Sequence, residues 1–216
     1  SFLHQIFGCV MIFDDIIEIE ENVIQTNLHR TGTTWGEAND TDVENTTRQP
    51  KTYMWDAVLY INSKKQTDLV AFAQVVLQEH TVTAIGNYTA LIARYNEPLM
   101  KKLQAFLEAV DYNGFANFDL KYDERDGKFK VFEVNIRQGR SSYYVTGMGH
   151  NMARYLVEDL IYNKKKQTTY LKGEFLFTVV PKAVLKKFVN NEQVLNEVKQ
   201  LLRKGKYRNP LFYPKD

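Results

Sequence analysis

Two carboxylates, a carboxamide and a guanidinium occur at odd-numbered positions within a short part of the sequence, at Asp119, Glu133, Asn135 and Arg137. Carboxylate and amide oxygens, without cysteine or clustered histidine, are the hard ligands that suit Mg²⁺ or Mn²⁺. The planar fork of an arginine can hold a phosphoryl oxygen. These residue types therefore support phosphoryl transfer from a metal–nucleotide complex.

A β-hairpin is expected to bring these side chains together. Residues 115–121 and 129–137 alternate polar and apolar side chains, which is typical of strands that bury one face. Residues 125–127, Arg-Asp-Gly, predict a three-residue loop with Gly127 in the left-handed conformation.

The register set by this loop places Glu124 opposite Lys128 and Asp119 opposite Glu133. Directly opposed carboxylates have Cβ atoms about 4.5–5.5 Å apart and repel each other, so a cation should offset them. Lys121 is one candidate and a divalent metal ion is the better one. A solvated polar face of an antiparallel sheet remains the alternative interpretation.

The same register sorts the hairpin residues into two faces. The first is expected to carry the polar set together with three apolar residues: Asn117, Asp119, Lys121, Glu133, Asn135, Arg137, Phe115, Phe129 and Val131. The second is expected to face the core: Ala116, Phe118, Leu120, Phe132, Val134 and Ile136.

Four sequence segments carry a resemblance to a known superfamily: FDLKYD with Asp119, FEVNIR with Glu133, QGRSS at 138–142, and QEHTVTAIGNYTALIA at 78–93. From about 53 to 163 the chain resembles the C-terminal half of the ATP-grasp nucleotide-binding fold. It is similar to carboxylate–amine ligases, including the D-aspartate ligases of peptidoglycan precursor synthesis, and to carbamoyl-phosphate synthase large subunits.

The resemblance implies an ATP-dependent ligase that joins a carboxylate to an amine through an acyl-phosphate. It implies these roles: Asp119, Glu133 and Asn135 as ligands of Mg²⁺ (or Mn²⁺); Arg137 on ATP; Arg137 and Arg140 in catalysis; Ser141 and Ser142 on the substrate. From the residues themselves, Lys121 could neutralise the carboxylate pair or contact the ATP phosphates, and His80 could contact the substrate or close a strand. The expected partners are small-molecule carboxylates and amines, not nucleic acid, and a homodimer is left open. A non-catalytic nucleotide-binding or interaction module and a carbamoyl-phosphate synthase-like enzyme are the alternatives.

Further elements predict an α+β fold, with an antiparallel sheet flanked by helices. The expected elements are a hairpin of 53–61 and 69–77, strands at 88–95 and 174–180, and helices at 96–110, 151–163 and 191–203, with a short helix after Pro181. Met148, Met152, Tyr155, Leu156 and Leu160 are expected in the core. We divide the chain into residues 1–52, interpreted as the remnant of a preceding lobe; 53–163, the ATP-grasp-like part; and 164–216, a basic extension.

Composition excludes several protein classes. The 216 residues are 44% hydrophobic and 25% charged, which excludes disorder of the whole chain, and no apolar run reaches the roughly 18 residues of a membrane span. A single cysteine, Cys9, and the lack of a signal-peptide pattern predict a cytoplasmic protein. Residues 164–216 hold 13 Lys and Arg against 4 Asp and Glu, which could attract an anion or could belong to exposed helix faces.

Overall fold

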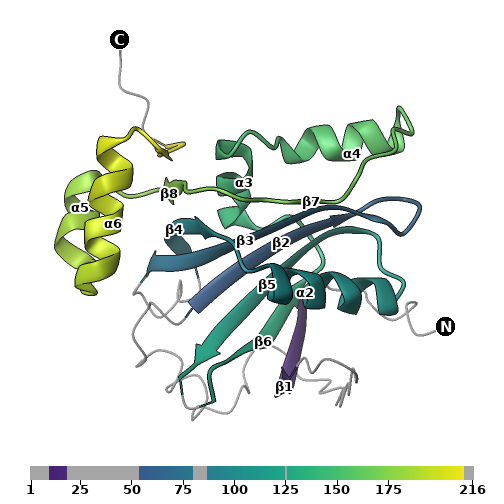
Figure 1. Ribbon diagram of the computed structural model, residues 1–216, viewed down its shortest axis with the longest axis horizontal. Helices are drawn as coiled ribbons and strands as arrows, with labels where there is room; N and C mark the ends of the chain where they lie inside the picture. Colours follow the sequence, from purple (N-terminus) through teal and green to yellow (C-terminus); the bar gives the residue numbers. More distant parts are fainter. Residues whose placement is uncertain (1–9, 19–53, 80–86, 125, 212–216) are drawn as a thin grey trace.

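The computed structural model describes residues 10–18, 54–79, 87–124 and 126–211, and within them one mixed, largely antiparallel sheet carries helices on both faces (Figure 1). The strands follow the order β1-β6-β5-β2-β3-β4-β8-β9, and β7 pairs in parallel with β3. The predicted α+β class is confirmed.

The strands are β1 Val10–Glu18, β2 Met54–Ile61, β3 Thr67–Gln78, β4 Tyr88–Arg94, β5 Gly114–Asp123, β6 Lys128–Asn135, β7 Thr169–Tyr170, β8 Leu176–Thr178 and β9 Tyr207–Arg208. The helices are α2 Glu97–Ala109, α3 Tyr143–Gly147, α4 Met152–Leu160, α5 Lys182–Phe188 and α6 Glu192–Arg203, with a 3₁₀ turn at Arg140–Ser142. No helix in these ranges is long and apolar enough to cross a membrane.

The centre of the sheet is the predicted hairpin of β2 and β3, whose residues are buried on both faces. Its turn is closed by the side chain of Asn62, whose Oδ1 accepts from the backbone N–H groups of Lys64 and Gln66 at 2.9 and 3.0 Å. Asn side chains favour turns because they can replace missing backbone partners in this way. Strand β5 pairs with β2 on one side of this hairpin, and strand β4 pairs with β3 on the other side.

Three apolar clusters attach the helices to the sheet. Helix α2 covers one face, where Leu103 and Phe106 pack on Phe118 and its neighbours. Helices α3 and α4 cover the other face, and α5 and α6 pack on the end formed by β4 and β8. Asparagines cap α2, α4 and α6: the side chain of each accepts from a backbone N–H in the first helical turn, as the sequence predicts for Asn96 and Asn151.

The β5–β6 hairpin corrects the predicted register near its turn. Gly127 is left-handed, with φ of 70°, but the loop has four residues, because Asp123 and not Glu124 pairs with Lys128. A β-bulge then leaves Phe132 unpaired, and beyond it Asp119 lies opposite Glu133 as predicted.

The bulge also changes which face two side chains occupy. Val131 lies opposite Leu120 and is buried with it in the cluster under α2, where Phe129 also packs. The prediction that Phe129 and Val131 share the polar face is wrong, because a one-residue shift in register moves each side chain to the other face. Phe115 does lie on the polar side, against Tyr60.

Helix α4 buries less apolar surface than its pattern predicts. Met152 and Tyr155 are buried, but Leu156 and Leu160 are 38% and 56% exposed, so their placement in the core is wrong. The inward face instead buries Asp159, which accepts hydrogen bonds from the Tyr60 hydroxyl and from Ser63. Hydrogen bonds from Tyr60 and Ser63 to Asp159 therefore attach α4 to the sheet where apolar packing of Leu156 and Leu160 was expected.

We expect Gly147→Ala to destabilise the protein by about 1–3 kcal/mol, the usual cost of overpacking a core. A Cβ at this position would lie 2.2 Å from two atoms of the Phe175 ring. Urea unfolding of the single variants and of G147A with Phe175→Leu measures the effect. The double variant should lose less stability than the sum of the two single changes, and simple additivity would contradict the predicted clash.

Candidate active site

Three carboxylates lie side by side on one face of three neighbouring strands. Asp56 on β2 is directly opposite Asp119 on β5, and Asp119 is directly opposite Glu133 on β6. Directly opposed residues share a face of the sheet, so the row crosses the strands at one level. We call Asp56, Asp119 and Glu133 the carboxylate row.

Asp56 is the member that the sequence analysis missed. It is fully buried and stands in an otherwise apolar strand, MWDAVLYI. One acidic residue in such a strand is the signal that could have identified it, since an unpaired charge is rarely buried without a purpose. Its proximity to Asp119 could not be inferred, because the pairing of β2 with β5 joins segments about 60 residues apart.

Asp56 is incompletely satisfied by hydrogen bonds. Asn117 Nδ2 donates to Asp56 Oδ1 at 3.1 Å, whereas Asp56 Oδ2 and Asn117 Oδ1 have no hydrogen-bond partner among the described residues. Burial, and then the charge of Asp119, raise the pKa of Asp56 well above its ordinary value, and hydrogen bonding from Asn117 and Ser141 opposes the rise. Two buried oxygen atoms therefore have unused capacity to accept a hydrogen bond among the described residues.

Asp119 occupies the middle of the row, so it lies next to both of the other carboxyl groups, Asp56 and Glu133. Burial, followed by repulsion from Glu133, raises the pKa of Asp119 to about 7, while the Tyr88 hydroxyl, Arg137 and Asn135 act in the opposite direction. Burial of the Tyr88 hydroxyl, and then the nearby charge of Asp119, raise the pKa of Tyr88. Near neutral pH the middle carboxyl is therefore poised between its two protonation states.

A short chain of hydrogen bonds continues from the row along β6. Asn135 Nδ2 donates to Asp119 Oδ2 at 3.1 Å, and Arg137 Nη2 donates to Asn135 Oδ1 at 3.2 Å. Asn135 is buried whereas Arg137 is exposed. The guanidinium thus stands at the solvent end of the cluster, where it can reach a charged ligand.

The segment after β6 folds back over the cluster. A Cβ at Gly139 would lie 1.8 Å from Asn117 Oδ1, so only glycine permits this close approach. Ser142 is fully buried, and its Oγ donates to the Gly139 carbonyl at 2.7 Å. Ser141 is buried near Asp56, and Arg140 is exposed.

The structure ties the other two predicted site residues, Lys121 and His80, less directly to the carboxylate row. Lys121 follows Asp119 by two positions on the same face, opposite Lys130, which itself pairs with Asp123 and Asp126. His80 lies outside the described residues. Within the described ranges, no group of three or more His, Cys, Asp or Glu side chains has the arrangement of a metal site.

Comparison with known proteins finds a ligase with a related sequence. No family model matches the chain. D-aspartate ligase of Enterococcus faecium (strain Aus0004) is 38% identical over 162 residues, which make up 73% of this chain and 38% of that protein. The chain therefore spans well under half the length of this relative.

Solved structures with a similar arrangement include two carboxylase components. Biotin carboxylase of Campylobacter jejuni, in a complex with βγ-ATP, has a TM-score of 0.47 and 11% identity, over 58% of this chain and 29% of that one. The ATPase subunit of phosphoribosylaminoimidazole carboxylase from Aquifex aeolicus has a TM-score of 0.43 and 14% identity, over 57% and 37% of the two chains.

The antiparallel sheet, with Asp119 opposite Glu133 on the Glu-x-Asn-x-Arg strand, agrees with the sequence resemblance to ATP-grasp ligases. Over the matched residues the chain is a homologue of D-aspartate ligase.

The stability of the metal-free protein should fall as the pH rises from about 4 to 7. Folded Asp119 keeps its proton up to about pH 7, whereas an unfolded aspartate releases it near pH 4. The folded state thus binds more protons in this window, and raising the pH favours unfolding. Asp56, whose pKa is raised, acts with the same sign.

Asp119→Asn should flatten this pH dependence and make the protein more stable at pH 8, by on the order of 2 kcal/mol. Urea unfolding at pH 5 and pH 8 in EDTA provides the measurement. Glu124→Gln, an exposed change on the same hairpin, is the control and should leave the slope unaltered. An Asp119→Asn variant with the wild-type slope would contradict the raised pKa.

Proposed function

We propose that this chain is the C-terminal part of the catalytic unit of an ATP-dependent carboxylate–amine ligase. D-aspartate ligase acting on a peptidoglycan precursor is the preferred member, supported by the 38% identical relative. The observation that carries the proposal is the carboxylate row, in which Asp119 on β5 lies between Asp56 on β2 and Glu133 on β6. Like charges so placed need a cation to offset them.

The donor types suit Mg²⁺, although the side chains are not gathered into a metal-binding arrangement in this structure of the described residues. They offer only hard oxygen donors, and Asp56 Oδ2, which has no hydrogen-bond partner among the described residues, adds one to the predicted set of Asp119, Glu133 and Asn135. We propose these four residues as the ones that hold Mg²⁺, with Mn²⁺ as a substitute. When bound, the metal would neutralise the charge of the ATP phosphates during transfer.

The proposed reaction has two steps that need no protein nucleophile. A substrate carboxylate oxygen attacks the γ-phosphorus of ATP, which breaks the bond to the β-phosphate oxygen and yields an acyl-phosphate and ADP. The amine then attacks the acyl carbon, and inorganic phosphate leaves as the amide forms and the amine loses a proton. Charge builds on the phosphoryl oxygens in the first step and on the acyl oxygen in the second.

Cationic side chains at the end of the row suit this charge. We assign Arg137 to the transferred phosphoryl group, because it is exposed yet held beside the row by Asn135. Lys121 is assigned to the nucleotide phosphates and Arg140 to the acyl-phosphate. Ser141 and His80 are assigned to the substrate.

Ser142 is assigned a supporting role within the substrate end. Its side chain is buried, and its hydroxyl bonds the Gly139 carbonyl. It therefore shapes the turn that carries Arg140 and Ser141. This revises the expectation that Ser142 contacts the substrate directly.

The proposal also covers the division of the chain into parts, the class of substrate and the cellular location. We propose residues 53–163 as the ATP-grasp-like part, 1–52 as belonging to a preceding lobe and 164–216 as an extension. The proposed substrates are small molecules, and the proposed location is the cytoplasm. A homodimer is compatible with these assignments.

Glu133→Gln should reduce Mg²⁺-dependent ADP release at least a hundredfold while leaving the circular dichroism spectrum and melting temperature close to wild type. The change removes a charge from the proposed metal site without removing core packing. ADP release from ATP is measured on the full-length protein with a panel of amino acids and amine acceptors. Glu124→Gln is the matched control, because it removes a charge from the same hairpin away from the row.

Activity of E133Q equal to that of E124Q would contradict the metal assignment. Nucleotide binding without turnover by any carboxylate–amine pair would favour a non-catalytic module. ADP release driven by bicarbonate and ammonia would favour the carbamoyl-phosphate alternative.

Asp56→Asn should separate stability from activity. The variant removes a buried charge but can still accept the hydrogen bond from Asn117, so the metal-free protein should be at least as stable as wild type at pH 8. ADP release should fall at least tenfold because an oxygen ligand is lost. Calorimetric melting in EDTA and the same release assay test both parts, and loss of stability with full activity would assign Asp56 a purely structural role.

A further inference from the structure

Helix α4 carries an apolar face that points away from the sheet. Figure 1 shows this helix above β7, at the outer edge of the view. Side chains spaced at i, i+1, i+4 and i+5 share one side of a helix, and the four at this spacing are each between 38% and 68% exposed: Leu156, Val157, Leu160 and Ile161. We call these four residues the α4 apolar patch.

The orientation of α4 is the reverse of that of an ordinary surface helix, which turns its apolar side chains toward the core. Helix α4 instead buries Glu158 and Asp159. Asp159 is held by the hydrogen bonds described above, and Glu158 pairs with Arg154, Lys164 and Lys166 at 2.9, 2.9 and 2.7 Å. These polar contacts fix the rotation of the helix, so its apolar face meets water unless another surface covers it.

The surroundings of the patch are positively charged. Three cations surround Glu158, and both carboxylates of α4 are buried. Lys165, just beyond the helix, and Lys64, beside Ser63 in the turn that contacts Asp159, are exposed and form no ion pair among the described residues. A partner that covers the patch must therefore combine an apolar surface with negative charge.

We propose that the α4 apolar patch docks on the surface of an anionic phospholipid bilayer. A helix lying in the membrane interface buries its apolar face at the edge of the acyl chains, and nearby lysines are attracted to anionic head groups. Tyr162, exposed at the end of α4, has an apolar ring and a polar hydroxyl, which suit the same boundary. The nine residues of α4 are too few to span a bilayer, which takes about 20, so the helix would lie along the surface.

Charge argues against a second copy of the chain as the partner. In a two-fold symmetric contact the same surface patch is used by both subunits. The cations around the patch of one copy would then face those of the other copy, and the buried carboxylates of α4 could not offset them. An anionic surface removes this repulsion.

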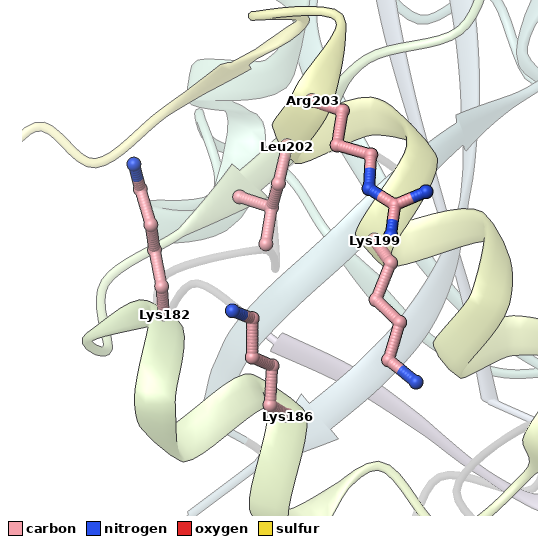
Figure 2. Close-up of a pocket in the computed structure, with 5 residues that line it drawn as sticks. All are labelled: Lys182, Lys186, Lys199, Leu202 and Arg203. Carbon is pink, nitrogen blue, oxygen red and sulfur yellow. The ribbon is translucent and has the colours of Figure 1, made fainter.

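A second basic surface, between α5 and α6, has the charge without the apolar face. It is lined by four cations and one half-buried apolar residue: Lys182, Lys186, Lys199, Arg203 and Leu202. Figure 2 shows that the ends of the four cationic side chains point in different directions. This surface therefore provides a matched control for the effect of charge alone.

The test is co-sedimentation of the full-length protein with vesicles of phosphatidylglycerol and phosphatidylcholine in equal parts, and with vesicles of phosphatidylcholine alone. We expect at least tenfold stronger partitioning into the anionic vesicles, weakened by added salt. Leu160→Gln with Ile161→Gln should reduce this partitioning at least tenfold, because glutamine preserves the helix but removes the apolar contact. Lys64→Gln with Lys165→Gln should reduce it at least fivefold.

Matched double variants on other surfaces are the controls. Phe188→Gln with Leu211→Gln removes two exposed apolar side chains, and Lys182→Gln with Lys186→Gln removes two exposed charges. Each should change the partitioning less than twofold. Glu133→Gln should bind vesicles as the wild type does, because the carboxylate row lies on β2, β5 and β6, so this proposal stands or falls separately from the ligase activity.

Absence of binding to the anionic vesicles would overturn the proposal. If L160Q with I161Q then lowered the melting temperature, the patch would belong to a contact within the full-length protein. If the same variant abolished a concentration-dependent dimer, the patch would belong to a contact between two copies. Equal binding to both kinds of vesicle, or equal weakening by the test and control variants, would also overturn it.

Discussion

Electrostatic repulsion among Asp56, Asp119 and Glu133 of the carboxylate row is the constraint that the surrounding hydrogen bonds on β2, β5 and β6 must offset. Asp56, Asp119 and Glu133 stand on adjacent strands, and the first two are held in surroundings of low polarity where the repulsion is poorly screened. Asn135 and Tyr88 supply hydrogen bonds that offset part of it. Among the described residues Asp56 Oδ2 has no hydrogen-bond partner, and the proposed cation would lie beside it.

The β-bulge in β6 is what allows the row and the core to coexist. With an unbroken register from the observed turn, Glu133 would not face Asp119, because each one-residue shift inverts the face of every following side chain. The unpaired Phe132 absorbs the shift. As a result Val131 and Leu120 stay in the apolar cluster, while the polar residues beyond the bulge remain on the other face.

The charges of this protein are separated into two regions with different surroundings. The acidic region is built on central strands, where burial raises the pKa of Asp56 and Asp119. The basic region is built on two surface helices whose exposed side chains keep their charges in water. A net charge of only +2 conceals this division. The two regions lie on different strands and helices of the same sheet-based fold, so their charges are separated in space.

The sequence by itself determined what depends on neighbours a few residues away. Asparagine caps, a glycine turn and strand alternation act over one to four positions, so Asn96, Asn151 and Gly127 could be interpreted correctly. The grouping of Asp119, Glu133, Asn135 and Arg137 at one end of the hairpin was predictable for the same reason, and their role as ligands stays a prediction.

Tertiary structure decided what depends on distant segments. The place of Asp56 beside Asp119 follows from the pairing of β2 with β5, the burial of Ser142 follows from a loop folding back, and the positions of α5 and α6 follow from their packing in one buried apolar cluster. These contacts depend on which apolar surfaces pack together in the folded chain. Local hydrophobic periodicity does not predict which distant segments will pack on each other.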